Sequence, residues 1–399
     1  MWQELLQVHS WASSQAARQK RIIAAWAAAC TILVALFYWP IIFTGYREIP
    51  SHDEWLIINA IRPHGIRGAY HYFEPHFWQR EISAQYVYYR PIALVSHAID
   101  YCLWGANPRP AHAVNIALHA VNVLLLGWLV ALLASNWLPG MLAGVLYAVL
   151  PTHAEPVSWV AARMDLLSGT FALASMVSVV LAQKRRAWLL VGVSALFFVL
   201  AVGAKETGGM LVVVVVLWAL TMARGAYRLP LIAAGVFSAL AAGYVCFRHF
   251  TGTIIMPPQR HHFRHLGFRF HTYYLSYPLA RLYEAIQARS VMWLDALGLA
   301  RGAAEGVLLW RCLAAAAVML VWRIAFYAPA LLLVQADNRY LYLPEMGSAA
   351  LLALITWQAA LWLRRCRRNF GWLPFAAYAC LLAISMGELL AHLRGWKAQ

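Results

Sequence analysis

The chain has 399 residues, of which 62% are hydrophobic and only 12% charged, with 19 tryptophans and a mean hydropathy of +0.60. This composition excludes an ordinary soluble domain. The net charge of +16 does not indicate nucleic-acid binding, because the basic residues fall between apolar runs. The six cysteines are scattered without paired spacing, which excludes a disulfide framework and a structural zinc site.

Apolar runs of near-spanning length recur along the chain and predict an all-α, polytopic membrane protein. The first run, 22–43, is too long for the apolar core of a signal peptide and is predicted to remain as a helix. Ten further runs bring the expected number of transmembrane helices to about eleven: 110–134, 137–151, 156–182, 187–204, 208–222, 229–248, 304–322, 325–336, 341–363 and 371–391. No stretch could bury a separate soluble core, so residues 1–399 are predicted to form a single integral membrane domain.

Basic clusters at 18–21, 184–186, 224–228 and 364–368 predict the orientation, because each lies at the end of an apolar run. The positive-inside rule places all four in the cytoplasm. The extracytoplasmic side then receives a large first loop, 44–109, and a basic, aromatic-rich loop, 249–303, which is predicted to be a part-ordered lid. The shorter segments 151–155, 205–207 and 337–340 face the same side. The compact loops favour a bacterial inner membrane.

Asp53 and Glu54 lie side by side just after the first apolar run. Carboxylates are rare in this chain, and such a pair at a membrane surface is costly unless it has a role. The alternative is a solvated acidic loop that caps a short helix. We predict that Asp53 is a general base and that Glu54 orients it or binds the acceptor.

Four cationic side chains are candidates to hold an anionic donor: Arg90, Arg163, Lys205 and Arg339. A guanidinium at headgroup level suits a phosphate group, because its fork of N–H donors matches phosphate oxygens. Other interpretations stay open. Arg339 would also serve as an orienting arginine or as a partner of Asp337, and Lys205 would also pair with Glu206 at a helix end.

A polar stripe marks the second apolar run. His112, Asn115, His119 and Asn122 have spacings of three, four and three, which place them on one helix face. In a membrane this face must contact protein or a wet cavity. Hydrogen bonding between helices is the favoured interpretation, and substrate contact through His112 is the alternative.

His153, Glu155 and Glu206 are further candidates to bind the hydroxyl groups of substrates. His153 and Glu155 lie in a proline-bounded loop, and with His52 and Asp53 they offer ligands that suit a divalent metal. Nothing local determines the separation of these four residues. No metal and no other cofactor is therefore predicted.

The acidic pair resembles the Asp-Glu motif in the first external loop of protein O-mannosyltransferases. Six further stretches, in order and with fitting spacing, resemble the membrane half of the transmembrane O-mannosyltransferases that carry tetratricopeptide repeats. No repeat domain is expected here after the last helix. The six stretches are Tyr89-Arg90-Pro91-Ile92, His112-Ala113-Val114-Asn115 with His119, Pro151-Thr152-His153-Ala154-Glu155, Ala162-Arg163-Met164-Asp165-Leu166-Leu167, Lys205-Glu206-Thr207-Gly208 and Asn338-Arg339-Tyr340-Leu341-Tyr342-Leu343-Pro344.

This resemblance implies a GT-C-type glycosyltransferase. Such an enzyme moves a sugar, mannose or another hexose, from a polyprenyl-phosphate carrier to a hydroxyl of a protein or a cell-envelope glycan on the outer face of the membrane. The residues agree with this reading, because an external polar surface beside lipid suits a donor whose tail lies in the bilayer. An inverting displacement needs one carboxylate to take the acceptor proton and cations to hold the leaving phosphate.

Two other classes of function remain open: a transporter or flippase of a lipid-linked glycan precursor, and a scaffold without catalysis. A carrier is expected to have polar residues through the middle of many helices, and often inverted repeats. Here the polar residues gather on one predicted face of the membrane, which favours the enzyme.

Overall fold

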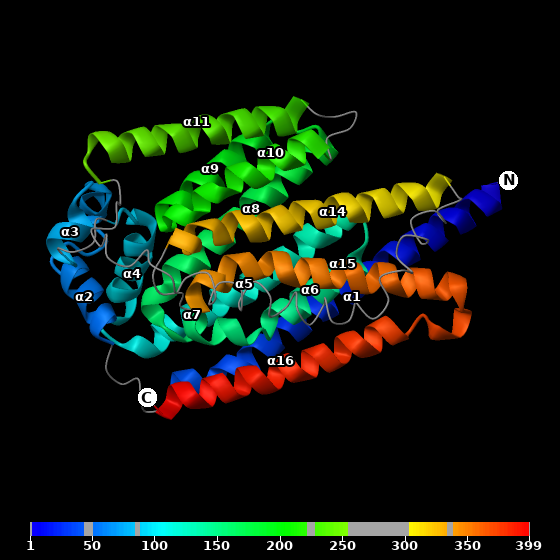
Figure 1. The fold of residues 1–399 in the computed structure, drawn as a ribbon, viewed down its shortest axis with the longest axis horizontal. Coiled ribbons are helices and arrows are strands. Elements are labelled where there is room, and N and C mark those ends of the chain that lie inside the picture. The colour runs from blue at the N-terminus through cyan, green and yellow to red at the C-terminus, as the bar shows by residue number, and fades with distance from the viewer. Residues whose placement is uncertain are drawn as a thin grey trace.

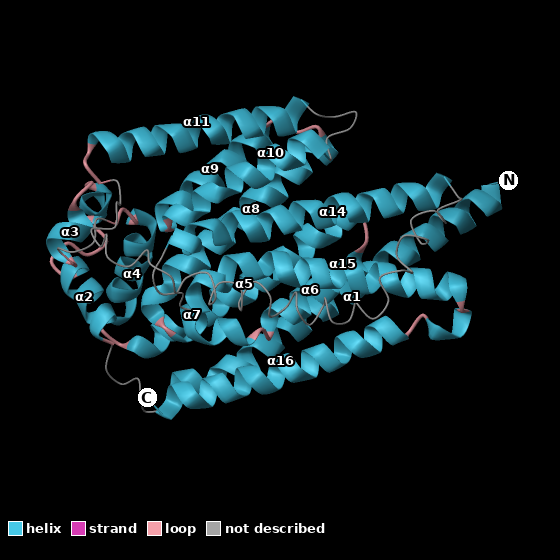
Figure 2. Ribbon diagram, viewed as in Figure 1, coloured by secondary structure: helices cyan, strands magenta, loops and turns pink. Residues whose placement is uncertain are grey.

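The computed structural model describes residues 2–43, 51–83, 88–221, 228–253, 303–332 and 338–398. Within these ranges the chain is helical and contains no β-strand (Figure 2). The long helices lie side by side in a bundle (Figure 1). They are α1 (Trp2–Phe43), α5 (Pro108–Ala134), α8 (Arg163–Arg185), α11 (Arg228–Phe250), α14 (Ala303–Tyr327), α15 (Tyr342–Cys366) and α16 (Leu373–Ala398), with the shorter α6 (Trp137–Ala148), α9 (Leu189–Ala204) and α10 (Leu211–Thr221) among them.

Short helices cover one end of this bundle, at the left of Figure 1, which we call the capped end. They are α2 (His52–Ile61), α3 (Phe77–Glu81), α4 (Pro91–Trp104) and α7 (Ala154–Ser158). A small hydrophobic cluster that includes Ile57, Tyr72, Phe77 and Leu94 packs α2, α3 and α4 together with the 3₁₀ turn η2 (Ala69–Phe73). The other 3₁₀ turns are η3 (Pro151–His153), η4 (Val160–Ala162), η5 (Glu206–Met210), η6 (Ala328–Leu332), η7 (Asn338–Leu341) and η8 (Arg368–Phe370).

Seven helices in the described ranges are long and apolar enough to cross a membrane, and three shorter apolar helices accompany them. The prediction of an all-α, polytopic membrane protein is confirmed. The predicted number of about eleven transmembrane helices is not confirmed.

The difference in number arises partly at Arg323. Its charge interrupts the apolar sequence, and we expected separate helices at 304–322 and 325–336 on either side of it. The structure instead has one continuous helix, α14, through this position. Arg323 is buried and donates to Glu345 Oε1 at 3.2 Å and to Ser348 Oγ on α15. Because the charge is paired inside the bundle, the helix does not need to end there.

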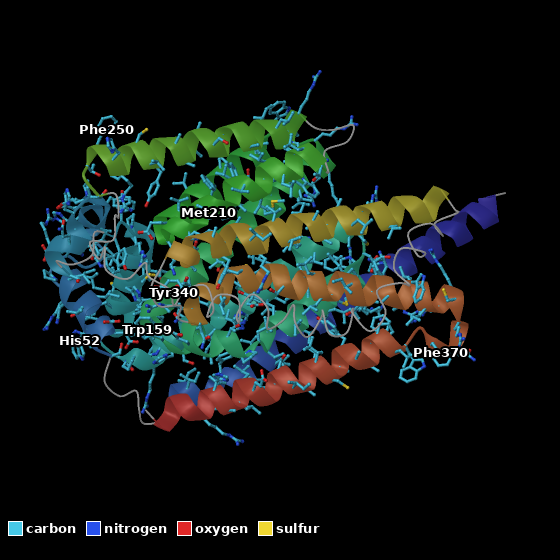
Figure 3. All side chains as sticks on the ribbon, in the orientation of Figure 1. His52, Trp159, Met210, Phe250, Tyr340 and Phe370 are labelled. Atoms are coloured by element: carbon cyan, nitrogen blue, oxygen red, sulfur yellow. The ribbon has the colours of Figure 1, made fainter. Side chains whose placement is uncertain are left out.

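The direction of α14 bears on the predicted basic loop, 249–303. Arg311, near the start of α14, donates to Ser135 Oγ at 3.4 Å, in the turn between α5 and α6 at the end opposite the capped end. The last residue of α11, Phe250, lies at the capped end (Figure 3). The described residues on either side of the predicted loop thus lie at opposite ends of the bundle. The sequence instead predicts that they lie at the same end, because both would face the extracytoplasmic side. The predicted lid itself, beyond Thr253, lies outside the described residues.

Candidate active site

Glu54 is held in place by the local structure of α2. The helix begins with a capping box, in which Glu54 Oε2 accepts from Ser51 N at 2.8 Å and Ser51 Oγ accepts from Glu54 N at 3.4 Å. The second carboxylate oxygen, Oε1, accepts from the backbone N–H of Val160 at 3.1 Å. Glu54 is buried. The helix-capping interpretation therefore describes Glu54, whose side chain also ties α2 to η4.

Asp53 has different surroundings, although it precedes Glu54 directly. Neighbouring residues of a helix point about 100° apart, and this rotation leaves the Asp53 side chain exposed while Glu54 is buried. The first turn of α2 lies at the capped end, where Figure 3 shows His52 on the same side of the molecule as Trp159 and Tyr340. An exposed carboxylate in this place is accessible to a substrate.

Arg163 is enclosed by protein groups. It is fully buried, and its Nη1 lies 2.5 Å from Asp100 Oδ2 of α4. Its Nε donates to Asn115 Oδ1 at 2.9 Å, and its Nη2 donates to the carbonyl oxygen of Ala111 at 2.9 Å. Since all three guanidinium nitrogens contact protein, the structure does not place Arg163 at an open phosphate site. Its position instead joins α8 to α4 and α5.

Lys205 and Glu206 do not pair with each other, in contrast to the alternative left open from the sequence. Lys205 is in extended backbone conformation, with φ −154° and ψ 141°, so the two neighbouring side chains point apart. The buried Lys205 Nζ pairs with Asp165 Oδ1 of α8, and it lies 5.0 Å from the centre of the Tyr340 ring. Lys205 thus contacts both α8 and η7.

Glu206 lies between two arginines. Its Oε2 accepts from Arg90 Nε at 3.0 Å, and its Oε1 lies 3.7 Å from Nη1 of Arg248. The Arg90 guanidinium also lies 3.8 Å from the centre of the Tyr88 ring, in the range of a cation–π contact. The cluster joins the start of α4 to the end of α11, and its charge is formally positive.

Arg339 lies on η7, half-buried at the capped end. Its guanidinium is 4.6 Å from the Trp159 ring centre and 5.2 Å from that of Tyr340. Trp159 precedes Val160, whose N–H binds Glu54. Arg339 and Glu54 thus contact two neighbouring residues, Trp159 and Val160 respectively. Asp337, the other partner considered for Arg339, lies outside the described residues.

The polar stripe of α5 forms hydrogen bonds between helices, so the favoured interpretation is confirmed. Asn115 binds Arg163, as described above, and Asn122 Nδ2 donates to the Leu166 carbonyl oxygen and to the Tyr342 hydroxyl, each at 3.0 Å. His119 Nδ1 lies 2.9 Å from the same hydroxyl. His112 is buried on this face, and its contact with a substrate stays a prediction.

His153 and Glu155 form no metal-binding group with His52 and Asp53 among the described residues. His153 is fully buried, with its ring centre 4.3 Å from that of Tyr147 and 5.1 Å from that of His119. Glu155 is half-buried in the first turn of α7, whereas His52 is exposed on α2. Within the described part of the chain, no group of three or more His, Cys, Asp or Glu residues is arranged to hold a metal ion.

Three paired acids went unassigned in the sequence: Asp100, Asp165 and Glu345. Each pairs with a buried cation: Asp100 with Arg163, Asp165 with Lys205, and Glu345 with Arg323. The signal that could have found them is the scarcity of acids, because the chain has only 16 Asp and Glu residues. In a membrane protein, each acid near an apolar run is expected to have a named partner.

A cavity of about 40 Å³ opens beside α2, with a polar wall formed by Glu54, His97 and Asp100. His97 lies on α4 and is only 8% exposed. Burial holds the pKa of His97 well below 6.5, and the nearby charge of Arg163 acts in the same direction. His97 is therefore neutral at pH 7.

This pKa predicts a dependence of stability on pH. Between the low pKa of folded His97 and the ordinary value of 6.5, the unfolded chain binds a proton that the folded protein does not. Stability is therefore fully present above about pH 6.5 and falls as the pH drops below it. We expect His97→Gln to flatten this dependence in thermal unfolding measured in detergent between pH 5 and 7.5. An unchanged slope would show that His97 does not contribute to it.

No protein-family model matches the chain. Among curated proteins, the protein O-mannosyl-transferase TMTC3 of Mus musculus is 28% identical over 206 residues, which cover 50% of this chain and 22% of that protein. Protein O-mannosyl-transferase Tmtc1 of Drosophila melanogaster is 31% identical over 137 residues, 33% of this chain and 16% of that protein. The match thus covers less than a quarter of the length of either relative, and the resemblance seen in the sequence is confirmed as a similarity.

Solved structures share the fold. The oligosaccharyltransferase of Archaeoglobus fulgidus, tethered to an acceptor peptide, superposes with a TM-score of 0.55 over 94% of this chain and 55% of that chain, at 13% identity. The same species' oligosaccharyltransferase AglB, in complex with an inhibitory peptide and a dolichol-phosphate, gives a TM-score of 0.51 over 95% of this chain and 56% of that chain, at 12% identity. The GT-C-like architecture is therefore confirmed.

Proposed function

We propose that the protein is a membrane glycosyltransferase that moves a sugar, mannose or another hexose, from a polyprenyl-phosphate carrier to a hydroxyl of a protein or cell-envelope glycan. The observation that carries this proposal is the arrangement at the capped end. There an exposed carboxylate, Asp53, shares one end of an apolar bundle with Arg90, Lys205 and Arg339. Similarity to O-mannosyl-transferases and the fold of an oligosaccharyltransferase support the class of reaction.

The reaction that suits these residues is a direct displacement at the anomeric carbon. The acceptor hydroxyl attacks from the side opposite the phosphate, so a new C–O bond forms while the bond from the sugar to the phosphate oxygen breaks. Asp53 takes the proton of the hydroxyl, and the phosphate leaves with the bonding electrons on its carrier lipid. One displacement inverts the configuration of the sugar. No step requires a metal.

Positive charge at the capped end is the second part of the proposal. Arg90, Arg248, Lys205 and Arg339 are partly neutralised by Glu206 and Asp165, which leaves these six groups formally positive. Arg339 lies over the face of Trp159, with its guanidinium 4.6 Å from the ring centre. The planar fork of N–H donors of a guanidinium matches the oxygens of a phosphate group. We assign the donor phosphate to Arg339 and Lys205, with Arg90 beside them. Glu155, Glu206, His112 and His153 remain proposed contacts or supports of the sugar and the acceptor.

The assignment of Arg339 predicts a defect in donor binding. Loss of a charge-assisted contact to phosphate is expected to raise the KM for polyprenyl-phosphate mannose by about tenfold or more in Arg339→Ala. Arg339→Lys should recover part of the loss. The measurement is sugar transfer by the purified protein in liposomes. Arg185→Ala is the matched control, because Arg185 is an exposed arginine at the last residue of α8, far along that helix from Arg163 and Asp165. A donor KM unchanged in Arg339→Ala would remove Arg339 from the phosphate site.

The same liposomes test the class of function. The capped end should face the side on which the transferred sugar is found, which we propose to be the extracytoplasmic side of a bacterial inner membrane. If the unmutated protein transfers no sugar but moves the lipid-linked donor between leaflets, the carrier hypothesis replaces the enzyme.

A further inference from the structure

The segment that carries Arg339 and Tyr340 is anchored to other helices just beyond its end. η7 passes directly into α15 at Tyr342, and Tyr342, Leu343 and Glu345 all bind other helices. The Tyr147 hydroxyl on α6 donates to the Tyr342 carbonyl oxygen at 2.9 Å. The Trp322 indole on α14 donates to the carbonyl oxygen of Leu343 at 2.9 Å. Arg323 on α14 pairs with Glu345, which lies in the same turn of α15 as Tyr342.

The Tyr342 hydroxyl is the centre of this anchor. It is fully buried, and it accepts from Asn122 Nδ2 at 3.0 Å. It must then donate its own proton to His119 Nδ1 at 2.9 Å, and His119 Nε2 donates to the carbonyl oxygen of Ala148 at 3.4 Å. This is the consistent assignment of donors and acceptors for a neutral imidazole. Two residues of the polar stripe of α5, His119 and Asn122, thus bind the same hydroxyl group.

We propose that Tyr342 is a positioning residue for the donor site, which it serves by holding η7 so that Arg339 and Tyr340 keep their places over Trp159 and Lys205. The inference rests on the proposed function. Tyr342 itself touches no reacting group, because its hydroxyl is fully occupied inside the bundle. Its effect on the donor passes through Arg339 and Tyr340, which precede it by three and two residues.

Three tyrosine-to-phenylalanine variants test this role, because each removes one hydroxyl from a buried or nearly buried ring. Tyr342→Phe and Tyr147→Phe remove two contacts of the anchor. Tyr378→Phe is the matched control, since the Tyr378 hydroxyl on α16 donates to the Leu142 carbonyl oxygen at 2.8 Å, away from η7. The probe is undecaprenyl phosphate, and its Kd is measured with the full-length protein in lipid nanodiscs.

We expect the Kd to rise by about five- to tenfold in Tyr342→Phe, because buried Asn122 and His119 lose their shared partner. Tyr147→Phe should raise it less, and Tyr378→Phe should leave it within about twofold. In an Arg339→Ala background the effect of Tyr342→Phe should be clearly smaller, because the part that passes through Arg339 is already lost. An equal effect of Tyr342→Phe in both backgrounds, or an equal effect of Tyr378→Phe, would overturn the proposal.

Hydrogen exchange of a peptide covering residues 338–345 provides a readout without donor. Exchange should be faster in Tyr342→Phe and Tyr147→Phe than in Tyr378→Phe. Unchanged exchange would show that the anchor does not hold η7, and faster exchange with an unchanged Kd would show that holding η7 does not serve the donor. If the unmutated protein does not bind undecaprenyl phosphate, the proposed donor site fails, and the positioning role fails with it even where exchange confirms the anchor.

Discussion

Asp53→Asn is expected to lower the rate of sugar transfer by at least about a hundredfold, since loss of a general base typically costs two to four orders of magnitude. The amide keeps the shape of the side chain but cannot take the acceptor proton. Asp53 is exposed in the first turn of α2, so its loss should change stability only by the small helix-dipole contribution, less than about 1 kcal/mol. Transfer and thermal unfolding are measured on the same preparation.

Glu54→Gln is the matched control for this prediction. It changes the neighbouring carboxylate in the same way, but Glu54 holds the N–H groups of Ser51 and Val160 rather than facing solvent. A glutamine offers one oxygen where the carboxylate offers two, so one of these bonds is lost, at a cost of about 1–3 kcal/mol in stability. The rate of transfer should fall much less than in Asp53→Asn. Full activity in Asp53→Asn would remove Asp53 from the mechanism, and a reversed order of the two variants would exchange their roles.

Arg163→Met is expected to lower the free energy of unfolding by about 3–5 kcal/mol, because it leaves Asp100 buried beside α5 without its cation. The double variant Arg163→Met with Asp100→Leu should recover part of this loss, since it removes the uncompensated carboxylate. Unfolding is measured in detergent by thermal denaturation.

Arg185→Met is the control here, because this residue of the same helix is exposed. The experiment also decides between two roles of Arg163. If Arg163→Met retained the stability of the unmutated protein but lost affinity for the donor, the phosphate role predicted from the sequence would be right, and the structural role assigned here would be wrong.

Much of the architecture follows from local properties of the chain. Long apolar runs predict membrane helices because the hydrocarbon interior requires about twenty apolar residues and internally satisfied backbone groups. The three-and-four spacing of the α5 stripe predicts its single face, since helical periodicity is a local property. The exception is instructive. The apolar runs 304–322 and 325–336 predict two helices, and only the pairing of Arg323 with Glu345, 22 residues further on, shows why α14 continues between them.

What the sequence determined by itself is therefore the class of protein, the helical membrane bundle and the set of polar residues worth testing. The tertiary structure decided which of those residues bind other groups of the protein and which face solvent. It separated exposed Asp53 from Glu54, whose partner Val160 is 106 residues away, and it paired Arg90 with Glu206, 116 residues away. It also enclosed Arg163. The physical reason is that hydropathy and helical period depend on neighbours in the chain, whereas the partner of a buried charge depends on which helices meet at the capped end.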